Sequence, residues 1–306
     1  MLTIQKLAPC SKGSVAAITL ENVNHMRVTL LSYGATIQSI VVPDANGVLT
    51  DVLLGYDTPA QYEQNDGYFG ASIGRNGNRI ADAAFVLNGT RYALTANEGS
   101  NQLHGGHTGF DKKLWSYSCR ENSVEFTTVL ADGEEGFPGR LEVSITFTLD
   151  DENGLHIDYR AVCDADTVAN FTNHSYFNLN GHGSGDILHH TLQLQADAYT
   201  PADAHTMPTG EIVPVAGTCM DFRTAKPIGQ DIAPLAESSL GGYDHCMAAD
   251  GEFGTLRPFG EFFEPLTGRR MKMSLTQPGV QFYTGNMLPG IAGKGGTVYG
   301  RYSGFC

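Results

Sequence analysis

The sequence predicts an all-β protein, and three observations support this fold class. Apolar and polar residues alternate with a period of two over residues 26–31, 123–129 and 141–149, which is typical of half-buried strands. Asn-Gly and Asp-Gly pairs punctuate the chain, and such pairs supply the positive φ that tight hairpins require. The 37 Gly and 13 Pro residues leave few windows with an apolar stripe of helical spacing, so we expect antiparallel hairpins and only short helices.

The expected turns follow the strand patterns along the chain. After the pattern at 26–31, turns are predicted at 44–47 and 87–89. The pair Asp132-Gly133 separates the next two strand patterns, and Asn153-Gly154 follows the last of them. This spacing favours sequential hairpins, in which each strand pairs with the next one in the chain.

The remaining segments indicate one continuous domain. Short helices are expected at 58–65, where a Thr precedes a Pro, and at 234–237. The Gly-rich segments 181–185 and 290–296 are expected to be loops between strands, because they lack the strand-to-helix context of a phosphate-binding loop. No fixed-period repeat, low-complexity tract or linker divides the 306 residues.

Composition excludes several classes of partner. The 33 acidic and 19 basic residues give a formal charge of −14, which would repel a phosphate backbone, so we expect no nucleic-acid partner. The six Cys residues lie far apart with no CxxC pair, so we expect reduced thiols and no metal site. No signal-like segment and no apolar run of about 18 residues is present. We therefore expect a cytoplasmic protein that does not associate with membranes.

Polar residues gather in clusters that suit a sugar site. Each cluster mixes hydrogen-bonding side chains with Gly or aromatic residues, as sugar recognition requires, because hydroxyl groups need fixed donors and acceptors while pyranose C–H faces stack on rings. The clusters are Gly74-Arg75-Asn76-Gly77-Asn78-Arg79, Leu103-His104-Gly105-Gly106-His107, Asn173-His174-Ser175-Tyr176-Phe177-Asn178 and Gly242-Tyr243-Asp244-His245.

The histidines of these clusters have alternative interpretations. His104 and His107 lie three positions apart, but the two Gly residues between them favour a turn over a metal-binding helix, and we expect His107 on an exposed loop. His174 has the chemistry to give or take a proton near neutral pH, and a core histidine bonded to backbone is the competing interpretation.

The other polar residues of these clusters also have two possible roles each. Asp244 is expected on a loop, where it either accepts hydrogen bonds from sugar hydroxyls or stabilises a turn. Arg79, next to Asn78, either offers its fork of donors to adjacent sugar oxygens or pairs with a nearby acid.

Taken in order, these motifs resemble the galactose mutarotase (aldose 1-epimerase) family. Its members carry Gly-Arg-x-x-Asn-Arg-Ile, Leu-His-Gly-Gly, Asn-His-Ser-Tyr-Phe-Asn-Leu and Tyr-Asp-His, and all four motifs stand here. Further segments similar to the family's sequences occur at 200–201, 208–210, 220–223 and 277–286, so the resemblance extends over nearly the whole chain.

The resemblance implies a fold and a site. It implies a large antiparallel β-sandwich, the galactose mutarotase-like supersandwich, with residues 1–306 as a single domain that is truncated at the C-terminus. It implies an aldose 1-epimerase that acts on a small neutral hexose such as galactose or glucose, as a monomer or homodimer, without a cofactor or metal. The residues expected to touch the sugar are Asn78, Arg79, His104, His174, Tyr176, Asp244 and Gln281.

The implied reaction is acid/base ring opening and reclosure. His174, with an expected pKa near the ordinary imidazole value, gives a proton to the ring oxygen, and His104 is the second catalytic residue beside it. A Glu takes the proton of the C1 hydroxyl, and rotation about the C1–C2 bond before reclosure yields the other anomer.

The family's Glu stands in a Gly-Phe-Cys-Leu-Glu-Thr-Gln segment, and the sequence ends within it at Cys306. We therefore expect residues 1–306 alone to bind sugar weakly and to catalyse poorly. A non-catalytic carbohydrate-binding or sugar-sensing protein is the main alternative. An epimerase of hexose 6-phosphates would require basic residues at the cleft rim, and the sequence shows no such cluster.

Overall fold

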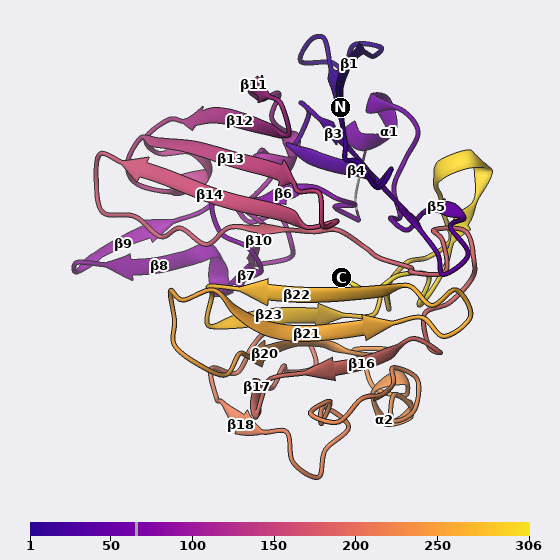
Figure 1. Ribbon diagram of the computed structural model, residues 1–306. Helices are drawn as coiled ribbons and strands as arrows, with labels where there is room; N and C mark the ends of the chain where they lie inside the picture. Colours follow the sequence, from indigo (N-terminus) through magenta and orange to yellow (C-terminus); the bar gives the residue numbers. More distant parts are fainter. Residues whose placement is uncertain (65–66) are drawn as a thin grey trace. The chain divides into compact units, whose positions relative to one another are not determined.

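A computed structural model describes residues 1–64 and 67–306 of the chain (Figure 1). Strands dominate it, which confirms the predicted all-β class. The Cα positions group into two compact units, Met1–Val41 with Gly55–Ser175 and Val42–Leu54 with Tyr176–Cys306. The single domain expected over residues 1–306 stays a prediction.

The first unit contains a layer built from the N-terminal strands. Its strands, each antiparallel to the next, are β1 (Leu2–Lys6), β2 (Ala16–Glu21), β3 (Arg27–Leu31) and β4 (Thr36–Pro43). The alternation of apolar and polar residues explains this arrangement, because the side chains of Ile18, Val28 and Leu30 lie on the same face of the sheet and are fully buried. The expected strand at 26–31 corresponds to β3.

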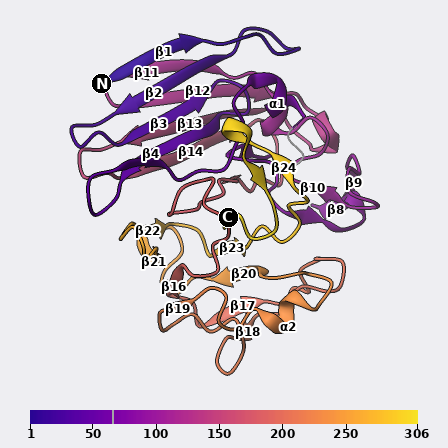
Figure 2. The same ribbon diagram turned by 90° about the vertical axis from the view of Figure 1, so that its right-hand side faces the viewer.

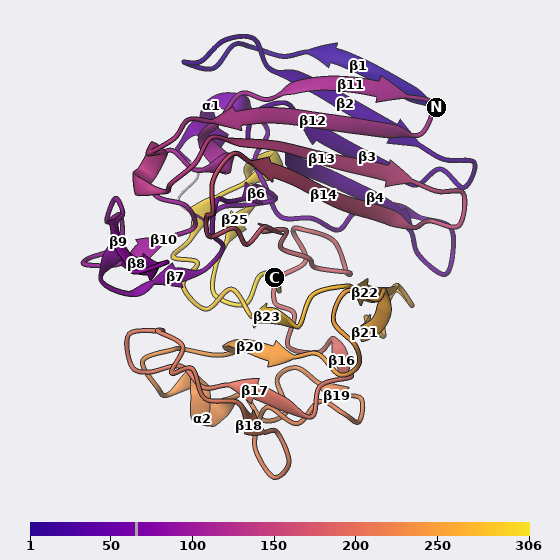
Figure 3. The same ribbon diagram turned by 90° about the vertical axis from the view of Figure 1, so that its left-hand side faces the viewer.

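A second antiparallel layer of the first unit contains β11 (Ser116–Arg120), β12 (Ser123–Leu130), β13 (Leu141–Leu149) and β14 (Leu155–Cys163). Figure 3 shows these four strands lying over β1–β4. Along β13 every second residue is buried, and Ile145 and Phe147 are completely covered. The strands expected at 123–129 and 141–149 are therefore confirmed as β12 and β13.

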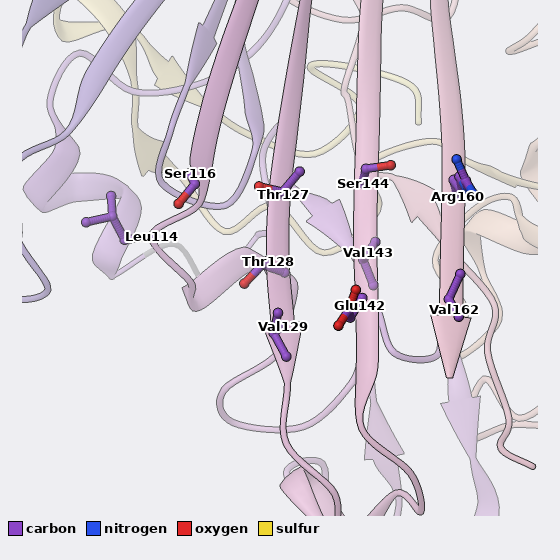
Figure 4. A pocket seen from close by; sticks show the side chains of 10 residues that line it. All are labelled: Leu114, Ser116, Thr127, Thr128, Val129, Glu142, Val143, Ser144, Arg160 and Val162. Atoms are coloured by element: carbon purple, nitrogen blue, oxygen red, sulfur yellow. The ribbon is translucent and has the colours of Figure 1, made fainter. Parts of the chain in front are cut away.

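The outward face of this second layer carries a shallow hollow. Thr127, Ser144 and Arg160 stand in one row across β12, β13 and β14 and line an open hollow of about 460 Å³ (Figure 4). None of the residues expected to touch a sugar lines it.

Short elements complete the first unit. They are α1 (Pro59–Glu63), β6 (Ser72–Ile73), β7 (Arg79–Ile80), η1 (Ala81–Ala83), β8 (Ala84–Leu87), β9 (Thr90–Ala93), β10 (Gln102–Leu103), η2 (Phe110–Lys112), η3 (Glu134–Gly136) and β15 (Thr172–Asn173). Thr58 caps α1 in a capping box with Gln61. Of the helix expected at 58–65, Asn65 lies outside the described residues. The β8–β9 hairpin turns at Asn88-Gly89 as predicted and projects from the unit (Figure 2).

The second unit has two four-stranded sheets and a hairpin. In spatial order they are β19 (Lys226–Pro227), β16 (Thr191–Leu194), β21 (Arg257–Phe263) and β22 (Arg270–Leu275); then β18 (Val213–Pro214), β17 (Ala198–Thr200), β20 (Asp244–Ala248) and β23 (Gly279–Tyr283); and β24 (Ile291–Ala292) with β25 (Val298–Tyr299). Aromatic residues fill the core, where the rings of Phe262 and Phe305 stack at 4.2 Å.

Three further elements belong to the second unit: β5 (Leu49–Asp51), α2 (Ala233–Ala236) and η4 (Lys294–Gly296). The helix α2 confirms the one expected at 234–237, one residue earlier. The prediction of a loop at 290–296 is partly wrong, because this segment forms β24 and η4. The β24 strand forms because it pairs with β25, and the local sequence shows no pattern that predicts this pairing.

The early segment Val42–Leu54 is fastened to late residues of the second unit. Arg269 Nη2 donates to Thr50 Oγ1 at 2.8 Å and to the Val48 carbonyl at 3.0 Å. Lys294 Nζ lies 2.8 Å from Asp51 Oδ2 and 2.8 Å from the Leu53 carbonyl. Each of these two buried cationic side chains donates to more than one group of the segment, so the segment is an integral part of this unit.

All six Cys residues are free thiols, as predicted. Among the described residues, the structure contains no helix that is both long and apolar enough to span a membrane.

Candidate functional site

His174 is held by backbone hydrogen bonds on both sides. It follows β15, whose Thr172 and Asn173 pair with β6. The His174 N–H donates to the Ala71 carbonyl at 2.8 Å, and the His174 carbonyl accepts from the Gly70 N–H at 3.0 Å. Two successive anchors fix the direction in which the His174 side chain leaves the backbone.

His104 is oriented by its neighbour in the fold, Asn78. Its backbone adopts a left-handed conformation with φ +52°, and its N–H donates to the Asn78 carbonyl at 3.2 Å. In return, the Asn78 N–H donates to Nδ1 of the His104 ring at 3.0 Å. Because Nδ1 is an acceptor, the neutral ring carries its proton on Nε2 and presents a hydrogen-bond donor there.

Three rings meet in the first unit: His104, His174 and Tyr68, which we call the ring cluster. The two imidazoles meet edge to face at 5.1 Å. Tyr68 lies edge-on to His104 at 4.7 Å and stacks on His174 at 5.7 Å. Sequence reasoning missed Tyr68; the available signal was an aromatic pair, Tyr68-Phe69, placed between two Gly residues.

Burial changes the proton affinity of both histidines. It lowers the pKa of His174 to about 4. It lowers the pKa of His104 well below its usual value, and the nearby His174 and Arg79 act in the same direction. The expectation that His174 titrates near the ordinary imidazole pKa is therefore wrong, because desolvation disfavours the charged ring. Both rings are neutral at pH 7.

Arg79 is paired with an acid, one of the two alternatives that the sequence left open. Its Nε and Nη2 donate to the two carboxylate oxygens of Glu98, both at 2.7 Å. The Arg79 side chain is 13% exposed and that of Glu98 is 36% exposed, so water reaches this two-pronged pair from the Glu98 side. Asn78 Oδ1 accepts from the Arg79 N–H at 2.8 Å. The pair fixes the guanidinium next to the loop that carries His104.

The second unit brings together the other three predicted residues. Asp244 is the first residue of β20, not a loop residue as expected. Pairing of β20 with β23 places it beside Gln281, whose Nε2 donates to Asp244 Oδ1 at 2.7 Å. Tyr176 is almost fully buried and meets the ring of Tyr283 edge to face at 6.0 Å. Strand register explains the contacts of Asp244, which the local sequence does not.

Cys306 adds a thiol to this second group, and sequence reasoning gave it no role. Burial raises its pKa, and the charge of Asp244 acts in the same direction. Its backbone pairs with Tyr283 through bonds of 2.7 and 2.8 Å. The thiol is therefore neutral, and it lies within the electrostatic reach of a carboxylate that Gln281 orients.

The remaining histidines of the clusters have other surroundings. His107 is exposed on its loop, as predicted. His245 is buried, its Nδ1 accepts from the Asp244 N–H at 3.2 Å, and burial lowers its pKa to about 4. In the part of the chain that the structure describes, no three His, Cys, Asp or Glu side chains are arranged to hold a metal.

Comparison with known proteins gives a consistent picture. Residues 16–306 match the family model described as aldose 1-epimerase. A galactose mutarotase of Sus scrofa is 43% identical over 302 residues, which cover 97% of this chain and 86% of that protein. An aldose 1-epimerase of Haemophilus influenzae is 42% identical over 289 residues, 94% of this chain and 84% of that protein.

Solved structures agree in fold. A GalM/aldose epimerase homologue from C. elegans superposes with a TM-score of 0.89 at 29% identity, covering 95% of this chain and 88% of that one. A galactose 1-epimerase from Lactobacillus acidophilus gives a TM-score of 0.86 at 29% identity, with coverage of 100% and 88%.

Proposed function

Because this chain belongs to the aldose 1-epimerase family, we propose that it interconverts the α and β anomers of a hexose such as galactose or glucose. The protein is an isomerase of carbohydrate metabolism. Identity above 40% with galactose mutarotases over 97% of the chain supports catalysis over the non-catalytic sugar-binding alternative. The ligand is a small neutral monosaccharide, and we propose a cytoplasmic location and a monomer or homodimer.

His174 is the proposed proton donor to the ring oxygen. Opening a hemiacetal requires an acid at that oxygen and a base at the C1 hydroxyl, each contributing a factor of roughly 10² to 10⁴. A neutral imidazole at pH 7 donates a hydrogen bond to the ring oxygen as negative charge develops there. Its two backbone anchors support this role, because proton transfer demands a fixed distance to the acceptor. In the family that the chain resembles, the base is the Glu of the Gly-Phe-Cys-Leu-Glu-Thr-Gln segment.

His104 and Arg79 are the proposed electrostatic partners. The Nε2–H of His104 is fixed as a donor by the Asn78 bond to Nδ1. Arg79, held by Glu98, supplies positive charge without needing to reorganise. Both groups favour an oxygen that becomes negative, and neither requires a cofactor.

The proposed sugar contacts divide by chemistry. Asn78 and Arg79 supply donors, and Asp244, oriented by Gln281, supplies acceptors for sugar hydroxyls. Tyr176 supplies an aromatic surface for a pyranose C–H face. This mixture suits a neutral sugar, because each hydroxyl needs both a donor and an acceptor.

The observation that carries the proposal is the anchored ring of His174 within the ring cluster. The test is polarimetry on freshly dissolved α-galactose, with a chain that carries the family's Leu-Glu-Thr-Gln segment. His174→Ala is expected to lower kcat by about 10² or more while circular dichroism stays unchanged. His107→Ala, on the exposed loop, is the control and should keep full activity. A His174→Ala protein with half of the original kcat would remove His174 from the mechanism.

A further inference from the structure

We propose that Tyr68 is a positioning residue for His174: its ring clamps the imidazole in the orientation that proton transfer requires and shields one face of it from water. The inference rests on the proposed function, because it assigns Tyr68 a role in the same reaction. Three features support it: the contacts between the rings, the backbone around Tyr68, and the backbone hydrogen bonds that join the Tyr68 segment to His174.

The ring geometry is that of a clamp. The Tyr68 and His174 planes are 25° apart with centroids at 5.7 Å, so one face of the imidazole lies against the phenol ring. His104 meets the same imidazole at 89° and 5.1 Å. Tyr68 also closes on His104 at 4.7 Å. Each of these contacts falls within the 4.5–7 Å that favours paired aromatic rings, so His174 is restrained from two directions.

The backbone at Tyr68 is locked by close packing. Tyr68 has φ +56°, a conformation that costs a non-Gly residue roughly 1 kcal/mol and persists only where the surroundings enforce it. Phe69 is completely buried, and the Tyr68 carbonyl accepts from the Ala71 N–H at 3.1 Å. Gly70 is so close to β4 that an added Cβ would lie 2.0 Å from the Ile37 carbonyl oxygen. Tyr68 therefore stands on a rigid base.

The same short ladder positions Tyr68 and His174 together. Gly70 donates to the His174 carbonyl, and Ala71 accepts from the His174 N–H. Asn173 Nδ2 donates to the Gly70 carbonyl at 3.0 Å. These hydrogen bonds tie together the segments that carry the two rings. An error of about 1 Å in the donor position is enough to cost about 10²-fold in rate, which gives this rigidity a kinetic purpose.

Shielding is the second effect of the clamp. His104 and Tyr68 are ionisable groups in ring contact with His174, and Arg79 acts on His104. Burial is the main reason that the pKa of His174 is low. Removal of the Tyr68 ring would open one face of the imidazole to water and bring its pKa back toward the ordinary value.

The test uses three Tyr68 variants in the chain with the family's Leu-Glu-Thr-Gln segment. Tyr68→Phe keeps the ring and should keep kcat within about threefold. Tyr68→Ala and Tyr68→Leu remove the ring face and should lower kcat at least about tenfold, with KM changed less than about threefold. Tyr117→Ala on β11, where the Tyr is 40% exposed, is the matched control and should keep full activity. Tyr68→Leu keeps most of the side-chain volume, so it still measures the effect of losing the ring on kcat if Tyr68→Ala fails to fold.

An NMR titration separates positioning from a purely structural role. Ring ¹⁵N shifts of His174, assigned by their loss in His174→Asn, are followed from pH 7.5 to 5.0. The wild-type ring should stay neutral over this range, whereas the ring in Tyr68→Leu should take up a proton. Unchanged kcat and an unchanged titration in Tyr68→Leu would overturn the inference. Full activity of His174→Asn would overturn the proposed function instead, and the titration would still test the clamp.

Discussion

Protonation of His190 is expected to destabilise the second unit in mild acid. This residue is 2% exposed, and its Nε2 accepts from the Leu179 N–H at 3.0 Å. Burial lowers its pKa to about 4, against the smaller opposing effects of Glu264 and Asp186. Protonation would put a charge in an apolar site and turn the accepting nitrogen into a donor that faces another donor.

The magnitude follows from linkage between proton binding and folding. The pKa of His190 is about 4 when folded and 6.5 as an ordinary imidazole. A lowered pKa gives stability that is complete above the unfolded value and is lost as the pH falls toward the folded one, because the unfolded chain binds the proton first. The loss for this group is about 2 kcal/mol at pH 5 and approaches about 3 kcal/mol near pH 4.

Urea unfolding at pH 7.5 and pH 5.0 measures this effect. His190→Gln keeps an acceptor for the Leu179 N–H but cannot be protonated, so it should lose about 2 kcal/mol less than the wild type between the two pH values. His107→Gln on the exposed loop is the control and should behave as the wild type does. If His190→Gln lost as much stability as the wild type, the burial argument for this histidine would be refuted.

Three further outcomes are expected from other groups. Burial raises the pKa of Asp111 from 3.8 to about 6, so Asp111→Asn should be about 3 kcal/mol more stable than the wild type in urea at pH 8. The difference should shrink to roughly half as the pH falls to 5, and an equal difference at both pH values would contradict this. Gly70→Ala should cost about 3 kcal/mol or more by the same assay, because its Cβ would collide with the Ile37 carbonyl. Glu98→Ala should lower kcat/KM for mutarotation about tenfold by releasing Arg79, and no loss would remove Arg79 from the site.

The longer strands were predictable because alternation extends over enough residues to be recognised. Strands β12 and β13 follow their patterns closely. The two-residue strands β6 and β15, which position His174, have no periodicity to detect. Long-range pairing creates them, and one sequence does not display it.

The candidate site was predictable in its polar residues and not in their surroundings. Motifs pointed to His104 and His174, but burial of their rings depends on tertiary packing, so their pKa values could not be foreseen. Tyr68 escaped notice because an aromatic residue near glycines resembles ordinary core. Asp244 was placed on a loop because Gly241 and Gly242 precede it, although β20 begins at the Asp itself.

The discontinuity of the second unit has a consequence for biosynthesis. Asp51 and its partner Lys294 are 243 residues apart in the chain. At roughly 5–20 residues per second, the ribosome makes Asp51 some 10–50 s before Lys294. The first unit has all its residues once Ser175 is made, whereas Val42–Leu54 lacks its hydrogen bonds to Arg269 and Lys294 until those residues are made. A nascent chain stalled between these points would carry Thr50 and Asp51 without the side chains that bind them in the finished fold.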